Sequence, residues 1–558
     1  MQIGIDIGGT TTDGVLLHKG EILRSAKHLT VENDLQISIF AVLDELTRGV
    51  DKSNIARVVL STTLVTNILA TGRGDETALV LIPGPGLNLG NMRLFPNTYI
   101  VEGATDFRGR IIEPLNEEQV KKTGKLISDA GIKKVAVVGK FSPRNNKHEQ
   151  RTKELLLLHD PRLEITLGYE ISGQLNFLRR AATSYYTAMT KDKWTAFAHS
   201  IEKALRVRGI ACPISILKAD GGTMPLAVSV ENPCETVFTG PAASVMGAFA
   251  ITGDEQTSLV IDIGGTTTDL GLILEGSPLY ASKGAVIEGY YTSIRAFNVS
   301  SIPLGGDSAV RLKDAELIIG PDRVGLAACF GGPVATPTDA LNILEDSQLG
   351  DVSLSMSALD KIAQPLGLTI IKAAELIVNK FVKSIEKSIY GMFKNWEQEP
   401  LYKVYEVVNK RSVKLDKVVG IGGAAKAFVP LVASRLGCDF LVHDYAPVAN
   451  ALGAAVARPT LSIILHADTQ QKHYYLNVDG ISGQIPKDFS LVHAKERAIQ
   501  HLQQLTKEQG LEQYADQYDF FLEEQFNTIS GYSTTGKIFD IGIQIAPGVI
   551  DEFKEGRS

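Results

Sequence analysis

The chain has 558 residues, of which 44% are hydrophobic and 21% charged, and its formal net charge is −7 at pH 7. This length is too great for one hydrophobic core and predicts about two to four domains. The negative charge disfavours a nucleic-acid partner, and no apolar run is long enough to cross a membrane.

Neither export nor disulfide chemistry is indicated. The N-terminus begins directly with a strand-like segment and lacks the basic and apolar regions of a signal peptide. The four cysteines are scattered, without the density of a disulfide scaffold or the close pairs of a metal site. We therefore expect a cytoplasmic protein with reduced thiols.

The chain opens with three predicted strands, at residues 2–7, 12–18 and 21–28. The nonamer IDIGGTTTD at Ile5–Asp13 spans the first turn and returns letter for letter at Ile261–Asp269. Strands are predicted on both sides of the second copy as well, so the repeated unit is a hairpin. This excludes the dinucleotide fingerprint and the P-loop, because both place a helix after the glycines.

Helices and strands alternate through the rest of the chain, which indicates an α/β protein. Predicted helices lie at residues 34–49, 116–131, 175–204, 370–394, 448–457 and 493–509. Further predicted strands lie at residues 57–61, 78–82, 134–140, 213–217, 417–421 and 440–443. We expect four parts: a first domain at 1–170, a connecting helical and strand region at 171–257, a second domain at 258–458 and a C-terminal appendage at 459–558.

The doubled hairpin suits a polyanion. A Gly-Gly turn brings backbone N–H donors close without obstructing side chains, and threonine hydroxyls add neutral donors. The candidate phosphate-binding residues are Gly8, Gly9, Thr10, Thr11, Thr12, Gly264, Gly265, Thr266, Thr267 and Thr268. Two such hairpins would close on the triphosphate of ATP from opposite sides. The alternative is a pair of structural hairpins left by gene duplication, but a structural turn does not require the same hydroxyls and carboxylates.

Four carboxylates accompany the two turns. A carboxylate that faces a phosphate needs a cation between them, so Asp6 and Asp262 are predicted to hold Mg²⁺ directly or through water. Asp13 and Asp269 are candidate metal ligands or general bases, and equally candidate hairpin braces that bond nearby backbone amides. We take all four as candidate catalytic residues and leave the identity of the base open.

A third glycine-rich turn lies at Gly422, Gly423 and Ala424, between a predicted strand and a helix. Such a turn leaves room for a flat base and a ribose against the backbone. A plain junction between a strand and a helix has the same pattern. Placed after the two hairpins, however, the turn has the order expected of an ATP site.

This order resembles that of the actin, sugar-kinase and heat-shock-chaperone superfamily. Further segments resemble the hydantoinase/oxoprolinase A-subunit family, namely Ser61–Asn67, Gly221–Met224, Thr239–Ala243, Gly320-Pro321, Ala328–Gly332, Pro337–Ala340 and Asn450–Gly453. The resemblance covers about residues 1–458. It implies an α/β fold of two duplicated ribonuclease-H-like (actin-like ATPase) domains around an ATP cleft, with a small C-terminal appendage.

The resemblance also implies a reaction: ATP-dependent activation of a small cyclic amide (a hydantoin, 5-oxoproline or another lactam) or a ketone by phosphorylation of its oxygen. A B-type hydantoinase subunit commonly completes that reaction. Candidate substrate contacts are Thr62, Thr63, Thr66 and Asn67, although a strand that ends in Thr and Asn also suits a turn or a helix cap. Asp307 stands where family members usually carry a third glycine.

Two alternatives stay open: a small-molecule kinase that releases a stable phosphorylated product, and a non-catalytic ATP-driven activator. Scattered cysteines do not suit the metal cluster of such activators. We expect Cys329 to be a buried small residue and Thr338 or Asp339 to cap a helix from Ala340 onward. A homo-oligomer is compatible with the sequence, which leaves the substrate, the need for a B subunit and the role of 459–558 open.

Overall fold

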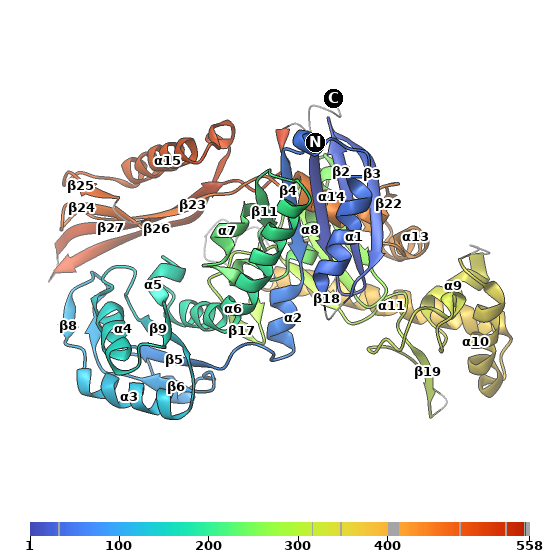
Figure 1. Cartoon of the computed structure of the whole chain (residues 1–558), viewed down its shortest axis with the longest axis horizontal. Coiled ribbons are helices and arrows are strands. Elements are labelled where there is room, and N and C mark those ends of the chain that lie inside the picture. Colours follow the sequence, from blue (N-terminus) through green and yellow to red (C-terminus); the bar gives the residue numbers. More distant parts are fainter. Residues whose placement is uncertain are drawn as a thin grey trace.

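The computed structural model describes residues 1–31, 34–314, 316–345, 349–399, 412–478, 481–530, 533–551 and 553. Four β-sheets of four or more strands carry these parts of the fold (Figure 1). Two of them lie at the centre of the molecule and contain the repeated hairpins.

The first sheet has the strand order β12-β11-β4-β1-β2-β3. Its strands are β1 (Gln2–Ile7), β2 (Thr11–His18), β3 (Glu21–Leu29), β4 (Arg57–Thr62), β11 (Ile214–Leu217) and β12 (Thr223–Pro225). Strand β1 is central, and its Ile3, Ile5 and Ile7 are fully buried, as expected for an apolar strand covered on both faces. The three predicted opening strands are confirmed to within one residue at each end.

The second sheet has the order β15-β14-β13-β21-β22, and β18 also pairs with β14. Its strands are β13 (Ser258–Ile263), β14 (Thr268–Leu274), β15 (Ser277–Pro278), β18 (Val299–Ile302), β21 (Lys417–Ile421) and β22 (Asp439–Val442). In each sheet the first hairpin strand also pairs in parallel with a later strand, β4 in one case and β21 in the other. This shared topology confirms the predicted duplication of a ribonuclease-H-like unit.

Two helices of small residues pack between the central sheets, α8 (Thr239–Thr252) and α14 (Ala449–Val456). They cross closely, because a Cβ added to Gly453 would overlap the carbonyl oxygen of Ala243. The backbone of α14 also lies against Gly4 of β1, where a Cβ would overlap Ala451 O. Glycine and alanine are needed at these positions because larger side chains would force the sheets apart.

The remaining helices cover the outer faces of the sheets or link them. They are α1 (Leu35–Leu46), α2 (Leu64–Ala70), α5 (Gly168–Ile171), α6 (Phe177–Val207), α7 (Leu226–Ser229), α9 (Pro337–Glu345), α10 (Val352–Leu366), α11 (Ile370–Glu397) and α13 (Ala425–Leu436). Helix α11 confirms the amphipathic helix predicted at 370–394, and its apolar stripe packs into the core of the second sheet. Helix α9 begins at Pro337 rather than at Ala340, so that boundary was predicted three residues too late.

Two further sheets lie on one side of the first sheet, whereas α9, α10 and β19 extend on the other side (Figure 1). The third sheet, order β10-β9-β5-β6, consists of β5 (Thr77–Ile82), β6 (Thr98–Ile100), β9 (Lys134–Gly139) and β10 (Glu164–Leu167), with α3 (Glu117–Asp129) and α4 (Lys147–His159). Three short strand pairs are β7 (Ala104–Thr105) with β8 (Ile111–Glu113), β16 (Val286–Ile287) with β17 (Tyr290–Tyr291), and β19 (Val310–Lys313) with β20 (Glu316–Ile319).

The C-terminal part forms a five-stranded antiparallel sheet, order β25-β24-β23-β27-β26. It consists of β23 (Ser462–Asp468), β24 (His473–Leu476), β25 (Ser482–Gln484), β26 (Tyr518–Ser530) and β27 (Ser533–Ile545), with α15 (Leu491–Glu508) packed on one face. Strands β11 and β12 come from the stretch 171–257 and extend the first sheet. The division of the chain at residues 170, 257 and 458 stays a prediction.

Candidate functional site

The two copies of the nonamer adopt the same hairpin. Asp6 lies opposite Asp13 in the register of β1 and β2, and Asp262 lies opposite Asp269 in that of β13 and β14. Each turn is closed by one backbone hydrogen bond of 3.0 Å, from Gly8 N to Thr11 O and from Gly264 N to Thr267 O. Identical sequence and identical closure give two turns of the same shape.

The tips of the hairpins meet. Thr10 Oγ1 lies 3.3 Å from Thr266 Oγ1, a contact between residues 256 positions apart in the chain. The equivalent threonines of two units thus face one another across the space between the two central sheets. A Cβ added at Gly9 would meet no heavy atom within 4 Å, so the first turn is open to a ligand.

The threonines of the hairpins divide by position. The buried Thr12 hydroxyl pairs with Thr30 Oγ1 at 3.0 Å, and the buried Thr268 hydroxyl donates to Leu304 O at 2.6 Å. These two hydroxyls are therefore engaged within the protein. Thr10 and Thr266, at the tips, direct their hydroxyls to the meeting point of the turns.

The four carboxylates line the base of the hairpins, and their surroundings differ. Asp6, Asp13 and Asp262 are buried. Oδ1 of Asp6 and Oδ1 of Asp269 are buried without a hydrogen-bond partner, whereas Asp13 Oδ1 lies 3.0 Å from Lys27 Nζ. Asp262 Oδ2 instead accepts hydrogen bonds from Ser244 Oγ of α8 at 2.7 Å and from Asn450 Nδ2 of α14 at 2.9 Å.

This environment disfavours negative charge at three of the positions. Burial, with the neighbouring carboxylates of Asp13 and Asp262, raises the pKa of Asp6 to about 7. Burial and Asp262 likewise raise the pKa of Asp269 to about 7. Burial also raises the pKa of Asp13, against the opposing charge of Lys27, whose Nζ lies 3.0 Å from Asp13 Oδ2. A cation beside these oxygens would offset the cost of their charge.

The donor set fits Mg²⁺. Unpartnered carboxylate oxygens are the hard ligands that this ion prefers, and it commonly takes only one or two protein carboxylates beside phosphate oxygens and waters. Within the described ranges no group of three or more His, Cys, Asp or Glu side chains encloses a metal position. Asp6, with its unpartnered oxygen, thus suits a cation shared with a bound phosphate better than a metal site made by protein alone, whereas Asp262 Oδ2 is already engaged by Ser244 and Asn450.

The glycine-rich turn at 422–424 lies against the second hairpin. Ala424 N donates to Ile263 O at 3.3 Å, and Gly422 adopts a φ of +86°, which favours glycine. A Cβ on Gly422 would overlap Asp262 Oδ1, whereas one on Gly423 would meet no heavy atom within 4 Å. The turn therefore connects the second hairpin to open space at the start of α13.

The predicted substrate contacts lie where β4 ends and α2 begins. Thr62 Oγ1 accepts from Leu64 N at 3.2 Å, and Thr66 Oγ1 accepts from Phe238 N at 3.0 Å, just before α8. Thr63 Oγ1 lies 3.4 Å from Ile7 O, next to the first Gly-Gly turn, and accepts from Asn67 Nδ2 at 3.3 Å. Thr63 and the exposed Asn67 are thus closer to a substrate role than Thr62 and Thr66, whose hydroxyls join elements together.

One charged residue at the hairpin tips was missed by the sequence analysis. Arg323 donates from Nη1 to Thr10 Oγ1 at 3.3 Å and from Nη2 to Asp307 Oδ2 at 2.9 Å. Asp307 in turn donates its backbone N–H to Gly265 O at 2.8 Å, on the second turn. Asp307, unusual for its position in the resembled family, is the only signal that could have suggested a nearby cation.

Two further predictions concern the segment before α9. Cys329 is buried, as expected, and burial raises the pKa of its thiol to about 12, which excludes a reactive thiolate near neutrality. Asp339 is the third residue of α9 rather than its N-cap: Thr336 Oγ1 accepts from Asp339 N at 3.3 Å, and Asp339 Oδ2 accepts from Thr336 N at 3.1 Å. Asp339 also accepts from Ala328 N and Cys329 N, at 2.9 and 2.8 Å, so it holds the preceding loop onto the helix.

Comparison with known proteins agrees with this geometry. The sequence profile of the Hydantoinase/oxoprolinase family matches residues 180–462, and that of the Hydantoinase/oxoprolinase N-terminal region matches residues 2–159. The chain belongs to the hydantoinase/oxoprolinase family. Within it, the chain is 26% identical over 436 residues to the acetophenone carboxylase gamma subunit of Aromatoleum aromaticum (67% of this chain, 59% of that protein). It is 24% identical over 482 residues to caprolactamase subunit alpha of Pseudomonas jessenii (78% of this chain, 67% of that protein).

The fold has the same relatives. A nucleotide-free structure of acetone carboxylase superposes with a TM-score of 0.72 at 18% identity, over 99% of this chain and 88% of that one. This hydantoinase/oxoprolinase family member thus has the predicted duplicated α/β fold, which it shares with acetone carboxylase. The chain spans about three fifths to two thirds of the length of the two relatives above. Among the described residues, no helix combines the length and apolar character needed to span a bilayer.

Proposed function

We propose that this family member binds ATP between its two hairpins and uses it to phosphorylate the oxygen of a small cyclic amide (a hydantoin, 5-oxoproline or another lactam) or a ketone. The contact between Thr10 and Thr266 carries the proposal, because two identical glycine-threonine turns that face one another form donors on both sides of a polyphosphate. The substrate class is supported by family membership and by relatives named as carboxylase and caprolactamase subunits.

The residues divide the work as follows. Gly9, Thr10 and Thr11 offer donors to the triphosphate from one side, and Gly265, Thr266 and Thr267 from the other, while the N–H groups of Gly8 and Gly264 close the turns. Gly423 leaves space for adenosine. Thr12 and Thr268 keep the hairpins in shape through their hydroxyls. Arg323, at the meeting point of the tips, supplies positive charge to phosphate oxygens.

The four carboxylates are assigned to metal binding and proton transfer. Asp6 and Asp262 would hold Mg²⁺, which supplies charge neutralisation for phosphoryl transfer. Asp13 and Asp269 lie opposite them and are positioned to accept a proton, because a carboxyl with a raised pKa is a stronger base. For a cyclic amide, phosphorylation of the carbonyl oxygen makes the ring carbon more electrophilic, and water attacks that carbon. For a ketone, loss of an α-proton and phosphorylation of the oxygen give an enol phosphate, whose nucleophilic carbon attacks the carboxyl donor as phosphate is released.

We propose a B-type hydantoinase subunit as the partner that completes the reaction. The two curated relatives above are each named as one subunit of an enzyme. The compartment proposed is the cytoplasm, which suits the four free cysteines.

A turnover assay tests the proposal. Release of ADP is measured with ATP, Mg²⁺ and a panel of hydantoin, 5-oxoproline, caprolactam, acetone and acetophenone, for the wild type, Asp6→Ala, Asp262→Ala and the control Asp488→Ala. Asp488 is an exposed loop residue before α15. We expect one panel member to stimulate turnover, a loss of at least about a hundredfold in the first two variants, and no change in the control.

The products decide between this function and its alternatives. Ring opening or carboxylation, with or without an added B-type subunit, supports the proposal. A stable phosphorylated product without further change would establish a small-molecule kinase instead. Turnover that responds to no panel member and only to another protein would establish an ATP-driven activator. Unchanged turnover in both Asp6→Ala and Asp262→Ala would refute the nucleotide site itself.

A further inference from the structure

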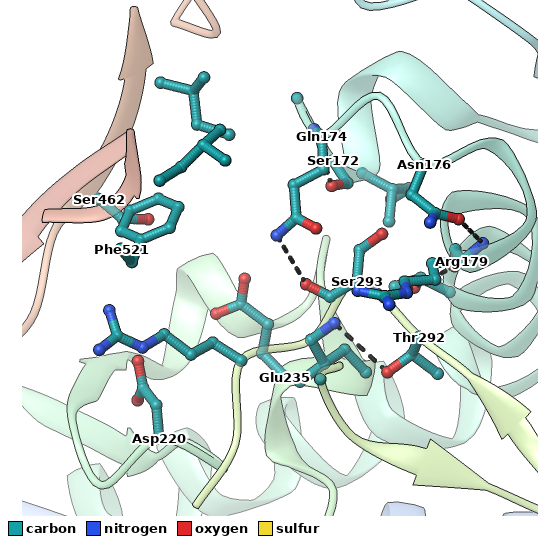
Figure 2. A pocket seen from close by; sticks show the side chains of 18 of the residues that line it. Ser172, Gln174, Asn176, Arg179, Asp220, Glu235, Thr292, Ser293, Ser462 and Phe521 are labelled. Carbon is teal, nitrogen blue, oxygen red and sulfur yellow. Dashed lines mark hydrogen bonds between the residues drawn. The ribbon is translucent and has the colours of Figure 1, made fainter. Parts of the chain in front are cut away.

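A cavity of about 610 Å³ lies beside the first sheet, outside the hairpins. Five parts of the chain enclose it: the loop before α6 and the first turns of that helix, the end of β11, the segment 232–235, the segment 280–295, and the C-terminal sheet. Figure 2 shows Phe521 and Ser462 of that sheet facing Gln174 and Ser172 across the cavity. Its volume is in the range of small-molecule sites.

The most informative lining residue is Arg295. Its guanidinium carbon lies 4.0 Å from the centre of the Tyr280 ring and 5.5 Å from that of Phe521. Its Nη1 is buried and has no hydrogen-bond partner. A buried guanidinium N–H without an acceptor is costly, and an acceptor in the cavity would remove that cost.

Other unpartnered polar atoms line the same cavity. Gln544 is 2% exposed, and its Nε2 donor has no partner. Ser293 Oγ is also buried without a partner, while its backbone oxygen accepts from Gln174 Nε2 (Figure 2). An amide donor and a hydroxyl therefore accompany the guanidinium, and all three suit an oxygen-bearing ligand.

The charges around the cavity favour a monoanion. Lys218 is already neutralised by Asp220, 3.3 Å away, and by Glu235 at 3.7 Å. Glu524 lines another wall, and burial together with Asp540 raises the pKa of its carboxyl. A multiply charged phosphate would face these carboxylates, whereas one carboxylate needs only Arg295 and its neighbours.

We propose that this cavity binds a small organic carboxylate, whose carboxylate group pairs with Arg295 while its body packs on Tyr280 and Phe521. The C-terminal sheet supplies Phe521 and Gln544, which gives the residues after 458 a role in ligand binding. Strand β1 pairs in parallel with β4, and β4 pairs in parallel with β11, so the carboxyl ends of these strands lie at the same end of the sheet. Gly8, which follows β1, is therefore two strand spacings, or about 10 Å, from the end of β11. The further assignment of this cavity as the site of the phosphoryl acceptor rests on the proposed function.

Binding is tested on the full chain without nucleotide, by calorimetric titration. The probes are matched pairs, 5-oxoproline with 2-pyrrolidinone and benzoate with benzamide, together with inorganic phosphate. We expect at least one carboxylate to bind about tenfold or more tightly than its neutral partner, because hydrogen bonds to charged groups are the strong ones. Arg295→Gln should abolish that difference, while Arg162→Gln, which removes an exposed guanidinium on another part of the chain, should preserve it.

A second variant guards against a folding defect in Arg295→Gln. Gln544→Met keeps the guanidinium and the side-chain size but removes the amide donor without adding a buried charge, and it should weaken the same carboxylate about fivefold. The inference is overturned if neither carboxylate binds, if the neutral partners or phosphate bind as tightly, if the difference survives Arg295→Gln, or if ATP displaces the carboxylate. Because no nucleotide is present in the titration, failed ATP turnover and failed carboxylate binding are separate results.

Discussion

Asp6 and Asp262 occupy equivalent positions in the two copies of the nonamer, and replacing each by Asn should change the stability of the protein in opposite directions. Asp6 is buried with an unpartnered oxygen, and its pKa is raised from 3.8 to about 7. This difference of about three pKa units corresponds to about 4 kcal/mol of lost stability once the carboxyl is ionised in the folded protein. Asp6→Asn keeps the shape and removes the charge, so it should stabilise the protein by up to about 4 kcal/mol above pH 7.

Asp262 occupies the same position in the second hairpin but has partners. Its Oδ2 accepts from Ser244 Oγ and Asn450 Nδ2. Asp262→Asn replaces these charge-assisted hydrogen bonds by weaker neutral ones and should destabilise the protein by about 1–3 kcal/mol. Both substitutions should abolish substrate-stimulated ATP turnover.

Calorimetric unfolding at pH 5 and pH 8, with EDTA and without nucleotide, separates these effects. The folded protein holds the Asp6 proton between pH 3.8 and about 7 and the unfolded chain does not, so this carboxyl lowers stability as pH rises through that window. The gain in Asp6→Asn should therefore be about 2 kcal/mol at pH 5 and about 4 kcal/mol at pH 8. An equal gain at both values, or a loss at pH 8, would refute the argument from burial.

Three more substitutions probe the nucleotide site and the packing below it. Gly423→Ala adds a Cβ that meets no protein atom, so the free energy of unfolding should be unchanged. An ATP analogue should nevertheless bind about tenfold more weakly, and an unchanged affinity would show that this turn is not part of the nucleotide site. Gly453→Ala, in the crossing of α8 and α14, should cost about 2 kcal/mol or more, whereas Gly391→Ala, in open space on α11, should gain about 0.5–1 kcal/mol. Arg323→Gln should raise the KM for ATP about tenfold, and the exposed control Arg162→Gln should not; equal KM values would leave Arg323 a structural role.

Local patterns determined what could be predicted. The Gly8-Gly9 turn between two apolar strands gave the first hairpin to within a residue, because strand period and turn chemistry are both local. The helical spacing of apolar residues likewise predicted α11. Repetition of the nonamer then predicted a second hairpin of the same shape, whereas the duplicated fold was implied by the resemblance to a known superfamily.

Partners distant in the sequence could not be predicted. Asp6 and Asp262 have identical neighbours along the chain, and only the packing of α8 and α14 gives one of them two hydrogen bonds. Arg323 lies in an irregular loop with no period to place it. Alternation along a strand places residues two apart on one face, so it does not distinguish Thr12 from Thr10, and which hydroxyl meets the opposite hairpin depends on how the two units pack.

The contact between the hairpin tips bears on the order of events in nucleotide binding. A triphosphate between Thr10 and Thr266 requires the two turns to separate, so opening precedes occupancy. A neutral hydrogen bond of this kind contributes only about 1 kcal/mol, but Arg323 also bridges Thr10 and Asp307, so opening has to break a charge-assisted contact as well. The measured affinity is then the intrinsic affinity multiplied by the open fraction, and association is limited by how often the turns part. Once the triphosphate is bound, the same two hydroxyls can form hydrogen bonds with it instead of with each other. The residues that close the empty site therefore also bind the ligand.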